Sequence, residues 1–255
     1  MPLTLEDASQ NGFAFRFGWG EAGLSALAPV CDVIVIVDVL RFTSAVSVAV
    51  AGGSIVFPYR WHDDGAIRYA VERGAVLAGP REDGPVSLSP TDLMSLPRGS
   101  RIVLPSPNGS ALSIRAAELG IPFVLAGSLR NATATAHWAM SLAHDSPIGV
   151  IASGERWSGS AAPLRPSVED LLGAGAVLAA LDPSAAVVGP RCSPEADAAR
   201  AAFVSARPLL DEALAACASG RQLVRTGSRD DVETAAELDA SNVAAQLIDG
   251  AFVAM

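Results

Sequence analysis

The sequence predicts an α/β protein of three layers (α/β/α), with helices on both faces of a mostly parallel or mixed sheet and a helical C-terminal part. Short runs rich in valine and isoleucine alternate with helical patterns, as in βαβ units. Half of the 255 residues are apolar but only 5% are aromatic, which favours small-residue helices packed closely on a sheet. We expect one domain over residues 1–255, with a subdivision near 145–190 as the alternative.

The strongest single signal is the unbroken apolar run Val33 to Val37, which is typical of a strand covered on both faces. Asp38 ends this run, Arg41 follows, and Thr43 and Ser44 open a helical pattern. Open α/β sheets bind ligands at such strand ends, where a carboxylate can hold a metal and a guanidinium an anion. The alternative is structural: Asp38 caps the loop and Arg41 is its partner.

The other elements follow the same alternation. Residues 13–17 alternate apolar and arginine as an edge strand does, and the glycines at 18, 20 and 23 are only a weak phosphate-binding signal. Further strands are predicted at 54–58, 75–78, 101–104, 123–126 and 148–152. Helices are predicted at 63–73, 111–119, 132–143 and 171–181, and from residue 193 onward at 196–204, 209–218 and 231–238.

Polar groups follow two more of these strands. Asn108, Gly109 and Ser110 lie at one strand-to-helix junction, and Ser128 and Asn131 lie at another. Free amides and hydroxyls at a helix start suit an anion. A tight turn with a serine cap explains the first junction equally well.

A long loop ending near residue 166, which suits a lid, leads to a helix opened by Ser167, Glu169 and Asp170. Ser167 can cap this helix, while the two acids favour its positive end. That structural account is complete, and it stands beside a role for Glu169 or Asp170 in binding a metal or positioning water.

Composition excludes several classes of function. The formal charge is −9 and all 18 basic residues are arginine, so P-loop and Schiff-base lysine chemistry is absent. An acidic chain without a basic run argues against nucleic acid, and no apolar run approaches the roughly 20 residues of a membrane span. The first residues show no signal peptide, so we expect a cytoplasmic protein. The three cysteines lack metal or disulfide spacing.

The loop from Asp38 to Arg41, D-V-L-R followed by a small hydroxyl pair, resembles the signature of the 2-phosphosulfolactate phosphatase family. Later segments match the family motifs T-N-G-T (here P-N-G-S, from Pro107), G-S-x-x-N-A and S-x-E-D in order, and G-x-x-x-D-V ends at Asp231 and Val232. Asp230 or Asp231 therefore either faces the site or caps a helix. Two family positions differ: Pro80 replaces a glutamate and Leu88 an asparagine.

The resemblance implies magnesium-dependent hydrolysis of a phosphate monoester on a small acid bearing sulfonate and carboxylate groups, as in coenzyme M biosynthesis. It implies catalytic roles for Asp38, Glu169 and Asp170, with Asp38 and Asp170 binding Mg²⁺. It assigns substrate binding to Arg41, Thr43, Ser44, Arg81, Asn108, Gly109, Ser110, Ser128 and Asn131.

Two other functions stay open. One is a phosphatase for a different phosphorylated acid, because Pro80 and Leu88 alter the pocket. The other is a catalytically silent anion-binding protein. In either case the partner is a small anion, and the oligomeric state is open, a homo-oligomer included.

Overall fold

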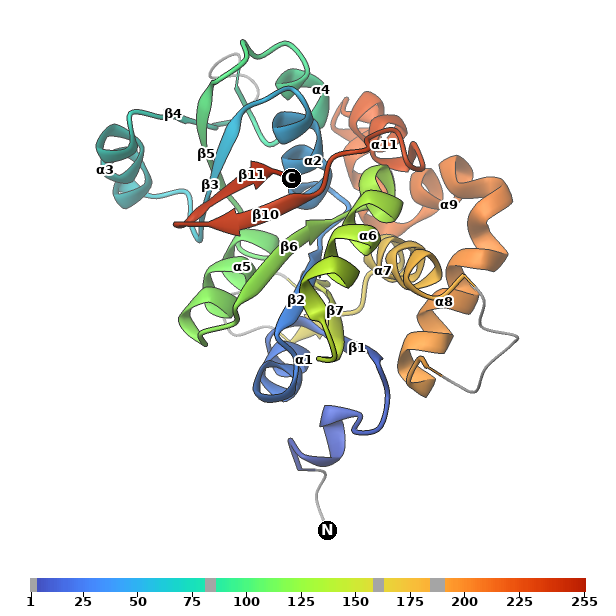
Figure 1. The fold of residues 1–255 in the computed structure, drawn as a ribbon. Helices are drawn as coiled ribbons and strands as arrows, with labels where there is room; N and C mark the ends of the chain where they lie inside the picture. The colour runs from blue at the N-terminus through green and yellow to red at the C-terminus, as the bar shows by residue number, and fades with distance from the viewer. Residues whose placement is uncertain (1–3, 81–85, 158–162, 184–190) are drawn as a thin grey trace.

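A computed structural model describes residues 4–80, 86–157, 163–183 and 191–255. Its centre is a nine-stranded sheet of order β1-β7-β2-β6-β10-β11-β3-β5-β4 (Figure 1). The strands are β1 Phe15–Trp19, β2 Val33–Val37, β3 Ile55–Tyr59, β4 Val76–Leu77, β5 Arg101–Pro105, β6 Phe123–Gly127, β7 Ile148–Ala152, β10 Ala245–Ile248 and β11 Ala251–Ala254. A separate pair consists of β8 Glu155–Arg156 and β9 Leu164–Arg165.

The sheet is mixed, as one form of the prediction allowed. Strands β1, β7, β2 and β6 pair in parallel, and so do β3, β5 and β4. The hairpin β10–β11 joins these two groups by antiparallel pairing with β6 and with β3. As predicted, the FAFRF segment contributes an edge strand, β1.

The C-terminal hairpin was not predicted from the sequence, where the helical pattern was expected to continue. Its turn is Asp249-Gly250, and both residues have positive φ angles, 51° and 80°. Asp-Gly between two short apolar strands is the strongest short-range signal of a two-residue hairpin. The signal was therefore present, and only the placement of the hairpin inside the sheet depends on tertiary structure.

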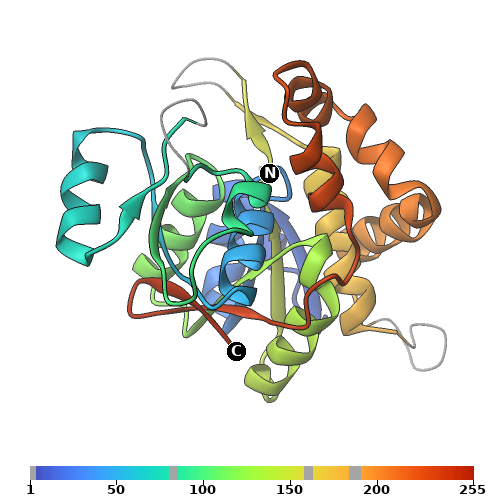
Figure 2. The same ribbon diagram turned by 90° about the horizontal axis from the view of Figure 1, so that it is seen from above.

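Helices cover both faces of the sheet (Figure 2). They are α1 Gly20–Leu27, α2 Phe42–Ala51, α3 Asp64–Arg73, α4 Pro90–Leu93, α5 Gly109–Glu118, α6 Ala132–Ala143, α7 Val168–Leu181, α8 Pro194–Ala206, α9 Leu210–Ala216, α10 Ala218–Arg225 and α11 Arg229–Ala236. Among the described residues, none of these helices is long and apolar enough to cross a bilayer.

Strand β2 shows why there are two helical layers. Val33, Val35 and Val37 belong to a core cluster with α6, α7 and α8, whereas Ile34 and Ile36 belong to another with α1 and α5. Successive side chains of a strand point to opposite faces, so an unbroken apolar run needs cover on both. The three-layer α/β/α prediction is confirmed.

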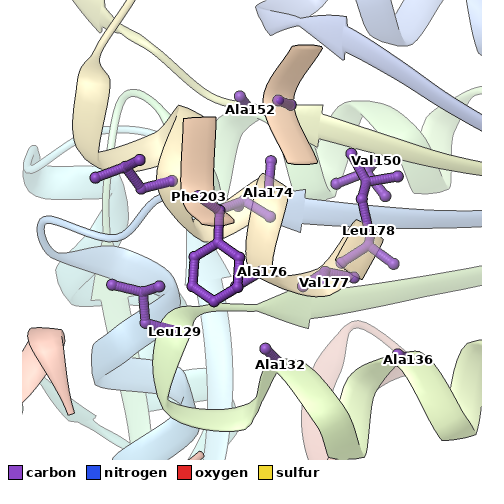
Figure 3. Packing of buried hydrophobic residues seen from close by; sticks show 14 of the residues in the cluster. Leu129, Ala132, Ala136, Val150, Ala152, Ala174, Ala176, Val177, Leu178 and Phe203 are labelled. Atoms are coloured by element: carbon purple, nitrogen blue, oxygen red, sulfur yellow. The ribbon is translucent and has the colours of Figure 1, made fainter. Parts of the chain in front are cut away.

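Small residues bring α7 close to its neighbours. Figure 3 shows Ala174, Ala176 and Val177 of α7 in the cluster that also contains Phe203 of α8. A Cβ atom at Gly175 would lie 2.2 Å from the carbonyl oxygen of Ala199, and one at Gly173 would lie 2.4 Å from Val39. The predicted close packing is therefore present, and it presses the start of α7 against the loop that follows β2.

Candidate active site

Asp38 lies at the end of β2, with only 5% of its surface exposed. Its Oδ2 atom accepts a hydrogen bond from the Gly109 backbone N at 2.8 Å, and Oδ1 accepts one from the Phe42 N at 3.3 Å. The ends of β2 and β5 thus meet although their strands belong to different parallel groups. The backbone amide of Gly109, in the N-G-S junction, therefore donates to the carboxylate of Asp38.

Gly109 is required for this contact. A Cβ atom there would lie 2.4 Å from the Phe42 ring and 2.8 Å from Asp38 Oδ2. We expect Gly109→Ala to displace the Asp38 carboxylate and to lower kcat of any activity that depends on it by about tenfold or more, because misplacing a reacting group by 1 Å costs up to about 10²-fold. Steady-state kinetics tests this, with Ser110→Ala as the neighbouring control; equal, small effects of both would contradict it.

The hydroxyl groups predicted to bind substrate around this loop have backbone partners. Thr43 Oγ1 donates to the Asp38 carbonyl at 2.8 Å and accepts from the Asp38 N, while Ser44 Oγ donates to the Val39 carbonyl. Ser110 Oγ donates to the Leu104 carbonyl at 2.8 Å. These hydroxyls fix the loops around Asp38.

Ser128 and Asn131 form a capping box before α6, in which Asn131 Oδ1 accepts from the Ser128 N and Oγ at 2.9 Å each. Asn131 Nδ2 also donates to the Ala126 carbonyl at 3.2 Å. Both residues are fully buried and line none of the cavities described below.

A cavity of about 210 Å³ opens beside Asp38, and we call it the Asp38 cavity. Its wall includes Arg41, Asn108 and Glu155, together with Leu40, Leu88, Ser106, Pro107, Ser219, Gln222 and Leu223. Asn108 Nδ2 donates to Glu155 Oε1 at 2.8 Å, and Arg41 Nη1 contacts Asp231 Oδ2 at 2.7 Å. The structure therefore brings Asp38, Arg41 and Asn108 together, as the sequence predicted, and adds Glu155.

Asp170 holds two loops together. Its Oδ1 accepts from the Val39 N at 2.8 Å, and its Oδ2 accepts from the Gly154 N at 2.9 Å and from Ser167 Oγ at 2.8 Å. Because Val39 follows β2 and Gly154 follows β7, the carboxylate ties the ends of two neighbouring strands to the start of α7. Both of its oxygen atoms have protein donors.

Glu169 differs from its neighbour. It is 2% exposed, and its Oε2 atom is buried without a hydrogen-bond partner. Buried carboxylate oxygens normally have donors or bind cations, so an orphaned one points to a missing ligand. Burial, and then the charge of Glu169, raises the pKa of the Cys217 thiol to about 12.

The carboxylates disfavour one another's ionisation. Burial raises the pKa of Asp38 to about 6, Glu155 and Glu169 push it in the same direction, and the amides of Gly109 and Phe42 oppose the shift. Burial and the charges of Asp38 and Glu169 raise the pKa of Asp170 well above its ordinary value. A cation among these groups would relieve the repulsion.

These shifts predict a pH dependence of stability. A carboxyl with a raised pKa binds its proton more tightly in the folded state, so its ionisation destabilises the fold. The free energy of unfolding of the metal-free protein should fall by up to about 3 kcal/mol as the pH rises from about 4 to 6. Urea unfolding in EDTA measures this, and Asp38→Asn should flatten the slope; an unchanged slope would contradict it.

Comparison with known families agrees with the site. The sequence model of the family described as 2-phosphosulpholactate phosphatase matches residues 24–250. The chain belongs to the 2-phosphosulpholactate phosphatase family. No curated protein matches it. Members of the family are phosphoric monoester hydrolases that act on a small phosphorylated substrate, and this is the activity class of the chain.

Two positions depart from the motifs of the 2-phosphosulpholactate phosphatase family, and they differ in whether they line the Asp38 cavity. Leu88 lines the Asp38 cavity, whereas Pro80 lines only an adjoining hollow of about 420 Å³. The asparagine-to-leucine change therefore alters the wall beside Asp38 and Arg41 directly. Arg81, predicted to bind substrate, lies outside the described residues.

Sequence reasoning did not single out every residue of this family member's cavity. Glu155 lies three residues after the end of β7, near the strand end that neighbours the end of β2, and this placement was its available signal. Ser219 and Gln222 come from α10, and their available signal was the resemblance of residues 219–223 to the family motif S-x-G-x-x-L, for which no site role was predicted. The sequence allows Asp231 either a site role or helix capping, and the structure places it against Arg41.

Proposed function

We propose that this protein is a Mg²⁺-dependent phosphatase of a small phosphorylated acid that carries sulfonate or carboxylate groups, of the 2-phosphosulfolactate type. The observation that carries the proposal is the Asp38 cavity, where the buried Asp38 and the half-buried Glu155 line the wall together with Arg41. Phosphoryl transfer depends on positioning and on neutralising charge on the phosphate oxygens, which the arginine and a cation bound by the carboxylate would supply together.

The residues present fit a hard divalent cation. Within the described ranges, no three acidic, histidine or cysteine side chains converge into a ready-made metal centre. Mg²⁺ is usually held by one or two carboxylates, with waters and substrate phosphate completing the shell. We propose Asp38 and the orphaned oxygen of Glu169 as its ligands, because Asp38 lines the cavity and its Oδ1 accepts a long hydrogen bond of 3.3 Å from the Phe42 N. We assign Asp170, whose two oxygens accept three hydrogen bonds of 2.8 to 2.9 Å, to orienting the loops.

When bound, the cation would neutralise the phosphate oxygens. Arg41 binds another oxygen of the phosphate group with its charged fork, and Asn108, oriented by Glu155, adds a neutral donor. Thr43, Ser44, Ser110, Ser128 and Asn131 act indirectly in this proposal, by holding the loops that present these groups.

The remainder of the substrate has a site next to the phosphate. A second cavity of about 280 Å³ shares Pro107 and Asn108 with the Asp38 cavity and is lined by Arg60, Arg115 and Arg156. Glu118 pairs with two of these arginines, at 2.6 Å from Arg60 and 3.5 Å from Arg115, and Glu21 also lines the cavity. Three guanidinium groups against two carboxylates leave an excess positive charge that suits a second anion.

Phosphate release in the presence of Mg²⁺ tests the proposal. A phosphorylated sulfonate should be hydrolysed with a higher kcat/KM than p-nitrophenyl phosphate, which has no second anion, and EDTA should stop both reactions. Faster hydrolysis of another phosphorylated acid than of the phosphorylated sulfonate would favour the alternative that the protein is a phosphatase for a different substrate. The observation that supports this alternative is Leu88 in the cavity wall. Failure to hydrolyse any monoester would overturn the proposal and leave the silent anion-binding protein.

A further inference from the structure

Asp231 is a buried carboxylate on α11, fully inaccessible to solvent. Its Oδ2 accepts from Arg41 Nη1 at 2.7 Å, and its Oδ1 accepts from Thr91 Oγ1 at 2.9 Å and from Ser89 Oγ. Three donors on two oxygens leave this side chain little freedom to move. Helix capping, the other explanation open from the sequence, does not account for these contacts, since all three partners lie far from α11 in the chain.

Arg41 is bonded to Asp231 through one nitrogen of its guanidinium group, and its side chain also reaches the Asp38 cavity. One Nη atom contacts Asp231, while the side chain is 25% exposed and lines the Asp38 cavity. A guanidinium has five N–H donors, so several remain for a ligand. An unrestrained arginine side chain loses conformational entropy when it binds, and a fixed partner removes much of that cost beforehand.

We infer that Asp231 is a positioning residue, which holds the Arg41 guanidinium so that its remaining donors face the oxyanion of the ligand in the Asp38 cavity. The inference rests on the proposed function in taking that ligand to be a phosphate group. It assigns the C-terminal helices a part in the site: α11 fixes the arginine, and α10 lines the cavity with Ser219 and Gln222.

The competing explanation is that the Arg41–Asp231 pair only attaches α11 to the rest of the fold. A double-mutant cycle separates the two. Binding of inorganic phosphate in the presence of Mg²⁺ is measured by calorimetry for the unchanged protein, Asp231→Asn, Arg41→Met and the double variant, with thermal unfolding recorded for each.

Asp231→Asn should weaken phosphate binding about tenfold, and Arg41→Met about tenfold or more, as expected for charge-assisted hydrogen bonds. In the Arg41→Met background, Asp231→Asn should have no further effect on binding. Glu233→Gln, an acid-to-amide change at an exposed position of the same helix, is the matched control and should leave binding unchanged.

Several outcomes overturn the inference. The first is a lower unfolding temperature of Asp231→Asn with unchanged phosphate affinity. The second is an equal loss of phosphate affinity when Asp231→Asn is made in the unchanged protein and in Arg41→Met. The third is no phosphate binding by the unchanged protein. If Asp231→Asn does not fold, Ser89→Ala, which removes one donor to Asp231, must weaken phosphate binding in the same direction. Phosphate binding that follows the cycle in a protein without phosphatase activity would support the inference while overturning the proposed function.

Discussion

Replacing Asp38 with asparagine should abolish magnesium-dependent phosphate release, with kcat reduced by at least about a thousandfold. The carboxylate is buried, lies beside Arg41 in the cavity, and is proposed to bind the cation that neutralises the phosphate. Such charge stabilisation contributes several kcal/mol to the transition state, and each 1.36 kcal/mol is a factor of ten in rate. Single-turnover phosphate release measures the loss.

The variant should still fold. At neutral pH the stability of its metal-free form should lie within about 1 kcal/mol of that of the unchanged protein, because relief of an ionisation that burial opposes offsets the loss of the long hydrogen bond from the Phe42 N. The second measurement is therefore the shift of the unfolding temperature on adding Mg²⁺, which should be present in the unchanged protein and absent in Asp38→Asn. A variant that keeps both its turnover and its Mg²⁺-dependent shift would remove Asp38 from the site.

Glu169→Gln and Asp170→Asn should fail in different ways, although the two acids are adjacent. Glu169→Gln should fold normally and lose Mg²⁺ affinity by tenfold or more, because it removes the charge on an oxygen that has no protein donor. Asp170→Asn should lower the free energy of unfolding by about 2 kcal/mol, since an amide accepts on one atom only and leaves a buried N–H without its acceptor.

Calorimetric titration with Mg²⁺ and urea unfolding, both performed on both variants, separate the two roles. Each variant serves as the control of the other. If Asp170→Asn loses Mg²⁺ affinity at normal stability and Glu169→Gln keeps its Mg²⁺ affinity, then Asp170 is the metal ligand. Small and equal effects on both properties would reduce both acids to stabilising the start of α7.

Much of the fold was predictable because it depends on local patterns. The β-branched run at Val33 to Val37, the alternation of strands and helices, and the small residues of closely packed helices each carry their information within a few residues. Asp38 and Arg41 were predictable for the same reason, since the end of a buried parallel strand is defined by the run that precedes it.

The remaining parts of the site depend on contacts between distant segments. No sequence pattern shows that the Gly109 amide faces Asp38 or that Asp231 reaches Arg41. Hydroxyl and amide side chains at strand ends are equally suited to a ligand and to the backbone, and only the packed structure decides between them. This is why five predicted substrate-binding side chains bond to the protein and line none of the cavities described: those of Thr43, Ser44, Ser110, Ser128 and Asn131.

The hairpin in the middle of the sheet constrains how the protein is made. Strands β6 and β3 flank the hairpin of residues 245–254, which contains the last strands in the described chain. On that side of each strand, β6 has no partner until β10 has been synthesised, and β3 has none until β11 has been synthesised. During translation both parallel groups therefore expose an open edge, and apolar edges of this kind invite association with other chains. A chain truncated before residue 245 would have two unprotected sheet edges. We expect a chaperone to be the first binding partner of such a chain.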